Sequence, residues 1–312
     1  MEDRTVTALE RIVVATDFSE TSLHAVDRAF LAARAAGARV TVVHALGMDA
    51  LQPLQPLLGG DRLGEVTATV RDAALAGLAD LVADPERTQG VVAQVELLEG
   101  AAAEAVRESA ARARADLLVV GARGTGLLRR LLLGSTASRL LRRSGCPVLV
   151  VRRRARDAYR RALVALDFSP STASTLRLAR AVAPRAELTL LHVFAVPFED
   201  KLRRARIGED VIERYRADVR ERATTRLHEA ARAAGLAPRD YAGIVLDGDA
   251  ARQIVLYEGR CGCDLVVMGK HGTHVTEELL LGSVTLDVLA ESRCDVLVVV
   301  DPRAAAPALT AG

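Results

Sequence analysis

The sequence predicts an α/β protein built from two copies of one domain, each a parallel sheet with helices on both faces. Three observations lead to this prediction: an internal duplication, short apolar runs typical of buried strands, and helical stretches between those runs. The chain has 312 residues, of which 50% are hydrophobic and 26% charged. This length and composition are those of about two globular domains.

The duplication rests on five landmarks that recur in the same order, 148 to 150 residues apart. Chance does not produce five ordered matches at so constant an offset, so one domain has been duplicated. Four of the landmark pairs are RIVVATDFS and RALVALDFS (11–19, 161–169), VTVVH and LTLLH (40–44, 188–192), VELLEG and IVLDGD (95–100, 244–249), and CPVLVV and CDVLVV (146–151, 294–299). The fifth is a pair of glycine-containing stretches, 121–135 and 269–283.

Within each copy, runs of Val, Leu and Ile alternate with stretches of helical periodicity. The runs are apolar on both faces, as strands of a helix-covered parallel sheet must be. The helix predicted over 20–36 has Leu23, Val26 and Phe30 on one face and ends before Gly37. The order βαβαβαβαβ therefore predicts five parallel strands per copy. The predicted strands are 11–16, 40–45, 91–98, 116–120 and 147–151, then 161–166, 188–194, 242–246, 264–268 and 295–300; further helices are predicted over 66–82, 101–114, 135–144 and about 209–234.

Three segments fall outside this pattern. The basic run 152–160 is interpreted as a solvated connector, with a docking patch as the alternative. The segment 48–65 is rich in Pro and Gly and follows the second strand, where it would cover a site. The predicted domains are 8–153 and 158–301, followed by a loose tail, 302–312.

Composition excludes several classes of protein. The net charge of +2 and the 3% aromatic content argue against a nucleic-acid binder. No apolar run approaches the ~18 residues of a membrane span, and the first residues lack the plan of a signal peptide. The sequence therefore predicts a cytoplasmic protein that binds neither nucleic acid nor membrane.

The four cysteines give one suggestive spacing, Cys261-Gly-Cys263. Small residues before a buried strand account for it, and the first copy has Ala113 and Ala115 at the matching positions. A metal or redox role is the alternative, but no CxxC pair or second cluster supports it. No metal-ligating residues are predicted.

The carboxyl ends of the predicted strands are where a ligand should bind, since open parallel sheets bind ligands at that edge. Each copy offers three polar or glycine-containing ends there. The first strands lead into Ala15-Thr16-Asp17 and Ala165-Leu166-Asp167, the second strands end in His44-Ala45 and His192-Val193, and the fourth strands are followed by the glycine-containing stretches.

The two stretches, GARGTGLLRRLLLGS and GKHGTHVTEELLLGS, share the skeleton Gly, two residues, Gly, nine residues, Gly-Ser. The first glycine would permit a turn with unusual dihedral angles, and the second would let the backbone approach a ligand. The serine would be the N-cap of a helix whose start attracts anions. The spacing predicts a phosphate cradle; two capped turns without a ligand are the alternative.

The strand-end aspartates and histidines each have two interpretations. Asp17 and Asp167 would accept a hydrogen bond from an adenine amino group or a ribose hydroxyl, or would merely cap the next helix. His44 and His192 follow apolar residues inside strands. Packed, hydrogen-bonded histidines are expected there, not catalytic ones.

At these residues the chain resembles the universal stress protein family. ATDFSETS, VTVVHA, DLLVVGARG, LLLGSTAS and CPVLVV carry the resemblance in the first copy, and LDFSPS, LTLLHV, DLVVMGKHG, LLLGSV and CDVLVV in the second. It covers about 11–300 as a tandem pair, and G-x2-G-x9-G-[S/T] is typical of the ATP-binding branch. It implies a Rossmann-like fold with strand order 3-2-1-4-5 in each domain.

The resemblance also implies a set of nucleotide-binding residues. Asp17 and the backbone of Ala45 would face adenine in the first copy, and the glycine-containing stretch would hold ribose and phosphates; the second copy departs from the first at Leu166, which replaces Thr16. The implied residues are Ala15, Thr16, Asp17, Ala45, Gly121, Arg123, Gly124, Gly134, Ser135 and Thr136, then Ala165, Asp167, Val193, Gly269, His271, Gly272, Gly282, Ser283 and Val284. Mg²⁺ would accompany the ATP phosphates, although no carboxylate cluster for it is visible.

Members of the family usually dimerise through the last strand. The resemblance therefore implies an intramolecular pseudo-dimer, in which CPVLVV pairs with CDVLVV, and leaves a further homodimer open. The expected function is that of an ATP-binding stress-response or signalling protein with protein partners yet to be identified. The alternatives are an ATP-hydrolysing or nucleotidyl-transfer enzyme, and an interaction module with one degenerate site. The first cradle offers arginines but no lysine and no obvious base, so only slow hydrolysis is expected.

Charge distinguishes the two cradles. The residues between Gly121 and Ser135 include three arginines and no acid, whereas those between Gly269 and Ser283 include Lys270, Glu277 and Glu278. With neutral histidines the charges are +3 and −1. We expect the first copy to bind ATP more tightly, and the second to hold a less charged adenine nucleotide or to stay empty.

Overall fold

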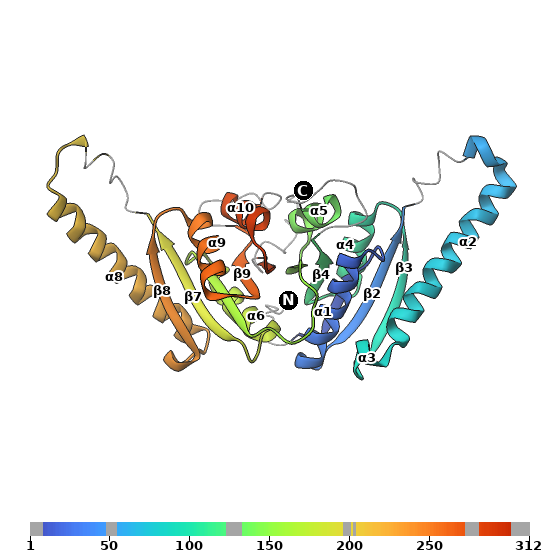
Figure 1. Cartoon of the computed structure of the whole chain (residues 1–312), viewed down its shortest axis with the longest axis horizontal. Coiled ribbons are helices and arrows are strands. Elements are labelled where there is room, and N and C mark those ends of the chain that lie inside the picture. The colour runs from blue at the N-terminus through green and yellow to red at the C-terminus, as the bar shows by residue number, and fades with distance from the viewer. Residues whose placement is uncertain are drawn as a thin grey trace, which may run out of the picture. The chain divides into compact units, whose positions relative to one another are not determined.

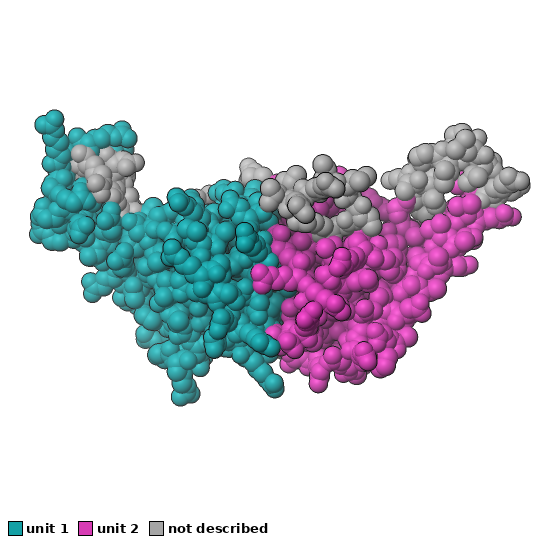
Figure 2. Space-filling view, in the orientation of Figure 1, with its two compact units in different colours: residues 1–5, 159–306 teal, residues 6–158, 307–312 magenta. Residues whose placement is uncertain are grey.

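The computed structural model describes residues 9–47, 55–122, 133–195, 201, 204–271 and 281–300, with the side chains of helix α2 described from Leu63 onward. The chain divides into two compact units, one built mainly from Val6–Ala158 and the other mainly from Tyr159–Ala306 (Figure 2). Each unit is an α/β domain with a parallel sheet and helices, as the sequence predicts, and each is described by itself.

The first unit has a five-stranded parallel sheet in which β1 is central and pairs with both β2 and β4 (Figure 1). β2 also pairs with β3, and β4 with β5, so the order is β3-β2-β1-β4-β5. β5 is fully buried, whereas β3, at one end of the order, is largely exposed or half-buried. The strands are β1 (Arg11–Ala15), β2 (Arg39–Leu46), β3 (Ala93–Glu99), β4 (Leu117–Gly121) and β5 (Val148–Val151).

Helices cover both faces of this sheet. Along β3, Glu96 accepts hydrogen bonds from Ser109 and Arg112 of α4, whereas Glu99 pairs with Arg71 of α2. Residues three apart in a strand point to opposite faces, so α2 and α4 lie on opposite faces. The helices are α1 (Glu20–Ala36), α2 (Gln55–Ala83), α3 (Pro85–Thr88), α4 (Ala102–Arg112) and α5 (Ser135–Arg143).

Two helices differ from the sequence prediction. Helix α2 begins at Gln55 and not at 66, so it includes 55–65 of the Pro- and Gly-rich segment 48–65; residues 48–54 lie outside the described residues. Ala74, Leu78 and Leu81 of α2 are buried, so packing anchors this helix, and each residue added to an existing helix costs little further free energy. The short helix α3 was not predicted; Asp84 is its N-cap and accepts a hydrogen bond from Glu86 N at 2.9 Å.

The second unit repeats this plan with β6 in the centre. β6 pairs with β7 and β9, β7 with β8, and β9 with β10, all parallel, which gives β10-β9-β6-β7-β8. The predicted helix over about 209–234 is confirmed as α8. The elements are β6 (Arg161–Leu166), α6 (Thr172–Val182), β7 (Glu187–Phe194), α8 (Glu209–Ala233), a 3₁₀ turn (Pro238–Asp240), β8 (Tyr241–Asp247), α9 (Ala250–Cys261), β9 (Leu265–Gly269), α10 (Ser283–Glu291) and β10 (Asp295–Val299).

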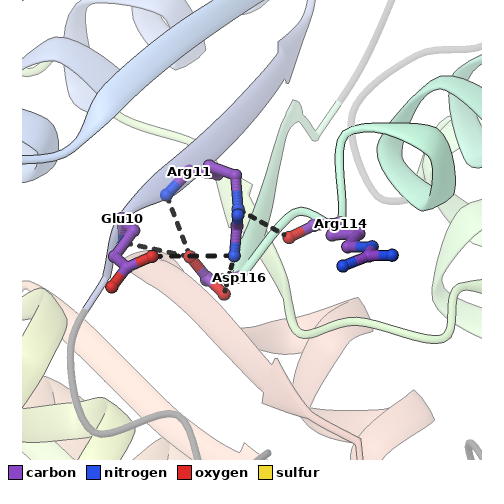
Figure 3. Close-up of polar contacts among 4 residues, drawn as sticks. All are labelled: Glu10, Arg11, Arg114 and Asp116. Atoms are coloured by element: carbon purple, nitrogen blue, oxygen red, sulfur yellow. Dashed lines mark hydrogen bonds and ion pairs between the residues drawn. The ribbon is translucent and has the colours of Figure 1, made fainter.

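An aspartate fixes the start of the central strand in each unit. In the first unit the Asp116 carboxylate accepts hydrogen bonds from the N–H groups of Glu10 and Arg11, at 3.0 and 2.9 Å (Figure 3). The Arg11 side chain in turn donates to Arg114 O at 3.1 Å. These contacts join the first residues of β1 to the turn before β4, so they set the register of the two strands. The register in turn decides which residues lie side by side at the carboxyl ends of the strands.

The second unit keeps the same arrangement. Asp264 accepts from the N–H groups of Arg160 and Arg161, at 2.8 and 3.1 Å, and the Arg161 side chain donates to Cys261 O at 3.2 Å. Asp116 and Asp264 are therefore repeated structural residues at the edge of the sheet opposite the predicted ligand site.

At the carboxyl end of β4 the backbone comes very close to the start of helix α1. A Cβ added to Gly121 would lie 2.9 Å from Thr21 O. In the second unit a Cβ on Gly269 would lie 2.8 Å from Ser171 Oγ, which is a side-chain atom. Neither glycine has a positive φ, so the expectation of unusual dihedral angles there is wrong. The glycine provides space for close packing of strand against helix.

We expect Gly121→Ala to be more harmful than Gly269→Ala. The new methyl group at 121 meets backbone atoms that cannot turn away, and overpacking of this kind costs about 1–3 kcal/mol of folding free energy. At 269 the Ser171 hydroxyl can rotate, so we expect a loss below about 1 kcal/mol. Denaturant unfolding of both variants measures the difference, and equal losses would show that the close approach at Gly121 is not the cause.

Asp116→Ala should destabilise the first domain by about 1.5–3 kcal/mol, because it removes a charged acceptor from two backbone donors. Asp116→Asn retains one acceptor oxygen and should recover part of that loss. The measurement is the denaturant midpoint of the first unfolding transition. A loss for Asp116→Ala no larger than that for the exposed control Glu108→Ala would show that the clamp is unimportant.

Candidate functional site

The central strand of each unit brings the predicted site residues together. Ala15 of β1 lies opposite Val43 of β2 and Val120 of β4, so the carboxyl ends of three strands are adjacent. Asp17, Ala45 and Gly121 follow at those ends. In the second unit β6 pairs in the same way with β7 and β9, and Leu166 lies opposite His192. Each unit therefore has a candidate site where its strand order reverses.

The turn that leaves the central strand contains a strained residue in each unit. Phe18 has φ of 61° and Phe168 has φ of 58°, in the left-handed region that bulky residues seldom adopt. Such a conformation costs about 1–3 kcal/mol and is concentrated at functional sites. These phenylalanines were not predicted as site residues, although the shared motif Asp-Phe-Ser was a signal that could have found them.

A histidine ring lies against each of these phenylalanines. His44 Nδ1 donates to Thr16 O and His192 Nδ1 donates to Leu166 O, both at 2.8 Å. The ring centroids are 4.7 Å from Phe18 and 4.3 Å from Phe168. The expectation of packed, hydrogen-bonded histidines is confirmed. Burial lowers the pKa of His192, and the nearby Arg226 lowers it further, so His192 is neutral at pH 7.

The strand-end aspartates organise the turn and do not cap the following helix. Asp17 Oδ1 accepts from Ser19 N at 3.1 Å and from Ser19 Oγ at 2.5 Å, and Ser19 is the N-cap of α1. Asp167 Oδ1 accepts from Ser169 N at 3.0 Å, and the N-cap of α6 is Ser171. In both units the carboxylate is half-buried at the end of the central strand.

The replacement of Thr16 by Leu166 changes the hydrogen bonding of this turn. Thr16 Oγ1 bonds Ser22 Oγ at 2.9 Å and accepts from Phe18 N at 3.0 Å. Leu166 has no hydroxyl, and the buried Thr172 Oγ1 lacks a partner within the described residues. The second turn is therefore held by fewer hydrogen bonds than the first.

The end of the fourth strand is tied to the start of the last helix. Gly134 N donates to Ala122 O at 2.8 Å, and Gly282 N donates to Lys270 O at 3.1 Å. Gly134 and Gly282 are the N-caps of α5 and α10, so the expectation that Ser135 and Ser283 are N-caps is wrong. Their carbonyl groups accept the first intrahelical bonds, from Ser138 N and Leu286 N.

This arrangement leaves helix starts that can bind an anion. Neither α5 nor α10 has a side-chain cap hydrogen bond, and Ser135 and Ser283 are exposed as first helical residues. Thr136 and Val284 follow them and are half-buried. A helix start without a side-chain cap offers backbone N–H donors and the positive end of the helix dipole.

Several predicted residues cannot be placed. Arg123, Gly124 and Gly272 lie outside the described residues, as do Arg129, Arg130, Glu277 and Glu278, whose charges distinguish the two cradles. Of the neighbouring residues, His271 is half-buried and Lys270 is buried, with 4% of its surface exposed. Lys270 occupies the position of Ala122 in the first unit.

The four cysteines lie within the described ranges, Cys263 and Cys294 buried and Cys146 and Cys261 half-buried. Burial raises the pKa of Cys263 to about 12 and also raises the pKa of Cys294, so both thiols are protonated at neutral pH. Among the described residues, no group of three or more His, Cys, Asp or Glu side chains could hold a metal ion. None of the described helices combines the length and apolarity that crossing a membrane requires.

Comparison with known proteins agrees with this architecture. A universal stress protein of Methanocaldococcus jannaschii is 31% identical over 144 residues, which are 46% of this chain and 82% of that protein. A universal stress protein of Mycobacterium tuberculosis strain H37Rv is 33% identical over 197 residues, covering 59% of this chain and 61% of the relative.

A crystal structure of a universal stress protein from Archaeoglobus fulgidus superimposes with a TM-score of 0.61 and 19% identity, covering 93% of this chain and 98% of that one, which supports the fold. The sequence model of the universal stress protein family matches residues 8–152 and again residues 158–300. The chain therefore belongs to the universal stress protein family and contains two of its domains in tandem.

Proposed function

We propose that the protein is a stress-response regulator that binds ATP in its first domain, and that nucleotide occupancy alters its interactions with partner proteins. The observation that carries the proposal is the start of α5, which has no side-chain cap and is tied to the end of β4 by the bond from Gly134 N to Ala122 O. A strand-end turn and a helix start joined in this way form two walls that suit a phosphate group.

The other end of the site suits a nucleoside. Asp17 is a half-buried carboxylate on a strained turn, and Ala45 lies at the end of the neighbouring strand. A carboxylate accepts hydrogen bonds from an amino group or from ribose hydroxyls, and a backbone carbonyl and N–H can read the edge of a base. Adenine with its ribose would occupy the strand ends, and the phosphates would extend to α5.

Charge favours ATP in the first domain. The three arginines between Gly121 and Ser135 would balance most of the charge of a triphosphate, whereas the corresponding segment of the second domain has a net charge of −1. The second domain is expected to hold a less charged nucleotide or none. Mg²⁺ bound to the ATP phosphates would further reduce the charge to be balanced, without requiring a protein site of its own.

An enzymatic role is the second candidate, and the arginines of the first cradle are the feature that favours it. Arginine stabilises a transferring phosphoryl group, but fast transfer also needs a base or a group that orients water. The histidines at the strand ends donate Nδ1–H to backbone carbonyls, and no lysine occurs in the first domain. These features support a sensor with at most slow hydrolysis. Pairing of the two domains through their last strands stays a prediction from the sequence.

The nucleotide that accompanies the purified protein tests this function. We expect heat-released extracts to contain ATP at about one equivalent per chain, with hydrolysis far below the ~10 per second of a median enzyme. Chromatography of the extract and a phosphate-release assay give the two numbers. Turnover near the median would favour the enzyme, and absence of bound nucleotide together with no binding of added Mg-ATP would favour an interaction module.

Two matched substitutions assign the site. Gly124→Asp places a carboxylate in the first cradle and should weaken the tighter ATP-binding event at least tenfold, about 1.4 kcal/mol. Gly272→Asp, the same change in the second domain, should leave that event within about twofold, since a site with no shared partners couples weakly. Calorimetric titration with Mg-ATP measures both. Loss of the tighter event in the Gly272 variant would reverse the assignment.

A further inference from the structure

Helix α8 places an arginine beside the strand-end turn of the second domain, where helix α2 of the first domain has a glycine. Arg226 Cζ lies 4.5 Å from the centroid of the Phe168 ring. In the first domain Phe18 lies against Gly77 instead, because a Cβ added to Gly77 would be 3.1 Å from Phe18 Cε1. In the first domain, therefore, even a Cβ at this place would press on the Phe18 ring, whereas the second domain presents a cation from it.

The two positions correspond within the repeat. Both helices bury an alanine and a leucine four residues apart against their sheets, and these residues have matching exposures of 7% and 0%. Aligning them places Gly77 of α2 opposite Arg226 of α8. The aligned buried residues are Ala74 with Ala223 and Leu78 with Leu227.

The Arg226 guanidinium retains its hydrogen-bonding capacity. Stacking on an aromatic ring uses the face of the guanidinium and leaves the N–H donors along its edge available. Arg226 is exposed and forms no ion pair within the described part of the chain. On the same helix, by contrast, Arg216 Nε is held by Asp247 Oδ2 at 3.2 Å.

An acceptor with spare capacity lies at the same turn. Ser169 Oγ bonds Ser171 Oγ at 2.9 Å, so Asp167 accepts only Ser169 N within the described residues. In the first domain the corresponding carboxylate, Asp17, takes both the N–H and the hydroxyl of Ser19. Asp167 thus has one carboxylate oxygen without a protein donor in the described structure.

Phe168 links the two groups, since Arg226 stacks on its ring and Asp167 directly precedes it in the chain. The pKa of His192 is lowered by burial and by the charge of Arg226, and it is raised in part by the charge of Asp167. The ring centroid of Phe168 also lies 4.3 Å from that of His192, so the stacked Arg226 and the imidazole share one aromatic neighbour. A carboxylate acceptor and a guanidinium donor are found together at the end of β6.

We propose that the second domain binds a guanine nucleotide, with Arg226 selecting the base. Guanine offers O6 and N7 as paired acceptors for a guanidinium, the commonest specific contact of arginine with a base. Its N1–H and N2 amino groups would donate to Asp167. Adenine carries an amino group in place of O6 and would face Arg226 with a donor. The inference rests on the proposed nucleotide site and changes the adenine ligand expected for this domain.

The test uses the full chain carrying Gly124→Asp, so that binding reports the second domain. GDP and ADP carry the same phosphates, and their calorimetric dissociation constants isolate the effect of the base. We expect GDP to bind about tenfold more tightly, the lower part of the range for one bidentate base contact. Arg226→Ala should remove this preference: the dissociation constant for GDP should rise about tenfold, whereas that for ADP should change by less than about twofold.

Two further variants sharpen the result. Arg226→Lys should fail to restore the preference, because a lysine ammonium neither stacks nor donates as a planar fork. Arg222→Ala removes a neighbouring arginine that pairs with Asp218, and it should change the affinity for neither GDP nor ADP. In the chain carrying Gly272→Asp, the first domain should bind ADP more tightly than GDP, as the adenine site proposed for it predicts.

Equal affinities for GDP and ADP would overturn the proposal, as would an equal loss for both ligands in Arg226→Ala, which would indicate general attraction of anions. If the second domain binds neither nucleotide while the Gly272→Asp chain still binds ATP, the guanine site is wrong and the proposed function stands. If the unaltered chain binds no nucleotide at all, the proposed function fails as well.

Discussion

The close approach of the fourth strand to the first helix is the constraint on which each domain depends. Because Gly121 leaves no space for a Cβ beside Thr21 O, the end of β4 and the start of α1 lie in direct backbone contact. The turn at Phe18, which connects β1 to α1, is therefore held in place because both elements contact β4. The aspartate clamp at the other edge, from Asp116 to the start of β1, fixes the same two strands along their length. Between these points the strand-end turn has little freedom, and a strained φ can be maintained there.

Duplication has kept this backbone and changed the side chains around it. The two clamps and the two glycines keep their places, because each serves packing within its own domain. Residues around the ends of the strands have diverged: Leu166 stands for Thr16, Lys270 for Ala122 and Arg226 for Gly77. A domain can change its ligand chemistry in this way without rebuilding its fold, since function resides in the site and the fold only positions it.

The sequence predicted the strands of both domains to within two residues, because runs of Val, Leu and Ile that are apolar on both faces are typical of strands buried between two layers of helices. It failed where geometry is set by tertiary contacts. The glycines at 134 and 282, not the serines after them, are the N-caps, since helix ends depend on which carbonyl accepts the first bond. The extension of α2 to Gln55 runs through glycines that propensity would exclude. The left-handed conformation of Phe18 had no signal in the sequence beyond the repetition of its motif. The contact of Arg226 with Phe168 could not be predicted either, because it depends on how a 25-residue helix is positioned along the sheet.

The divergence of the two sites has a thermodynamic consequence. A ligand shifts a conformational equilibrium only by the difference in its affinity for the two states. Two identical sites would therefore both respond to the concentration of the same ligand. Under the proposed assignments, sites that differ in charge and in the donors at their strand ends would respond to two chemical signals. The strained turns are the elements through which each response would begin, because about 1–3 kcal/mol stored at a phenylalanine is comparable to a coupling energy between sites. A ligand that bonds Asp17 competes with Ser19, whose N–H and hydroxyl both donate to that carboxylate, whereas a ligand on Asp167 can use the second oxygen. Binding in the first domain would therefore redistribute hydrogen bonds beside the strained Phe18. A change of conformation caused by the ligand would begin at this turn.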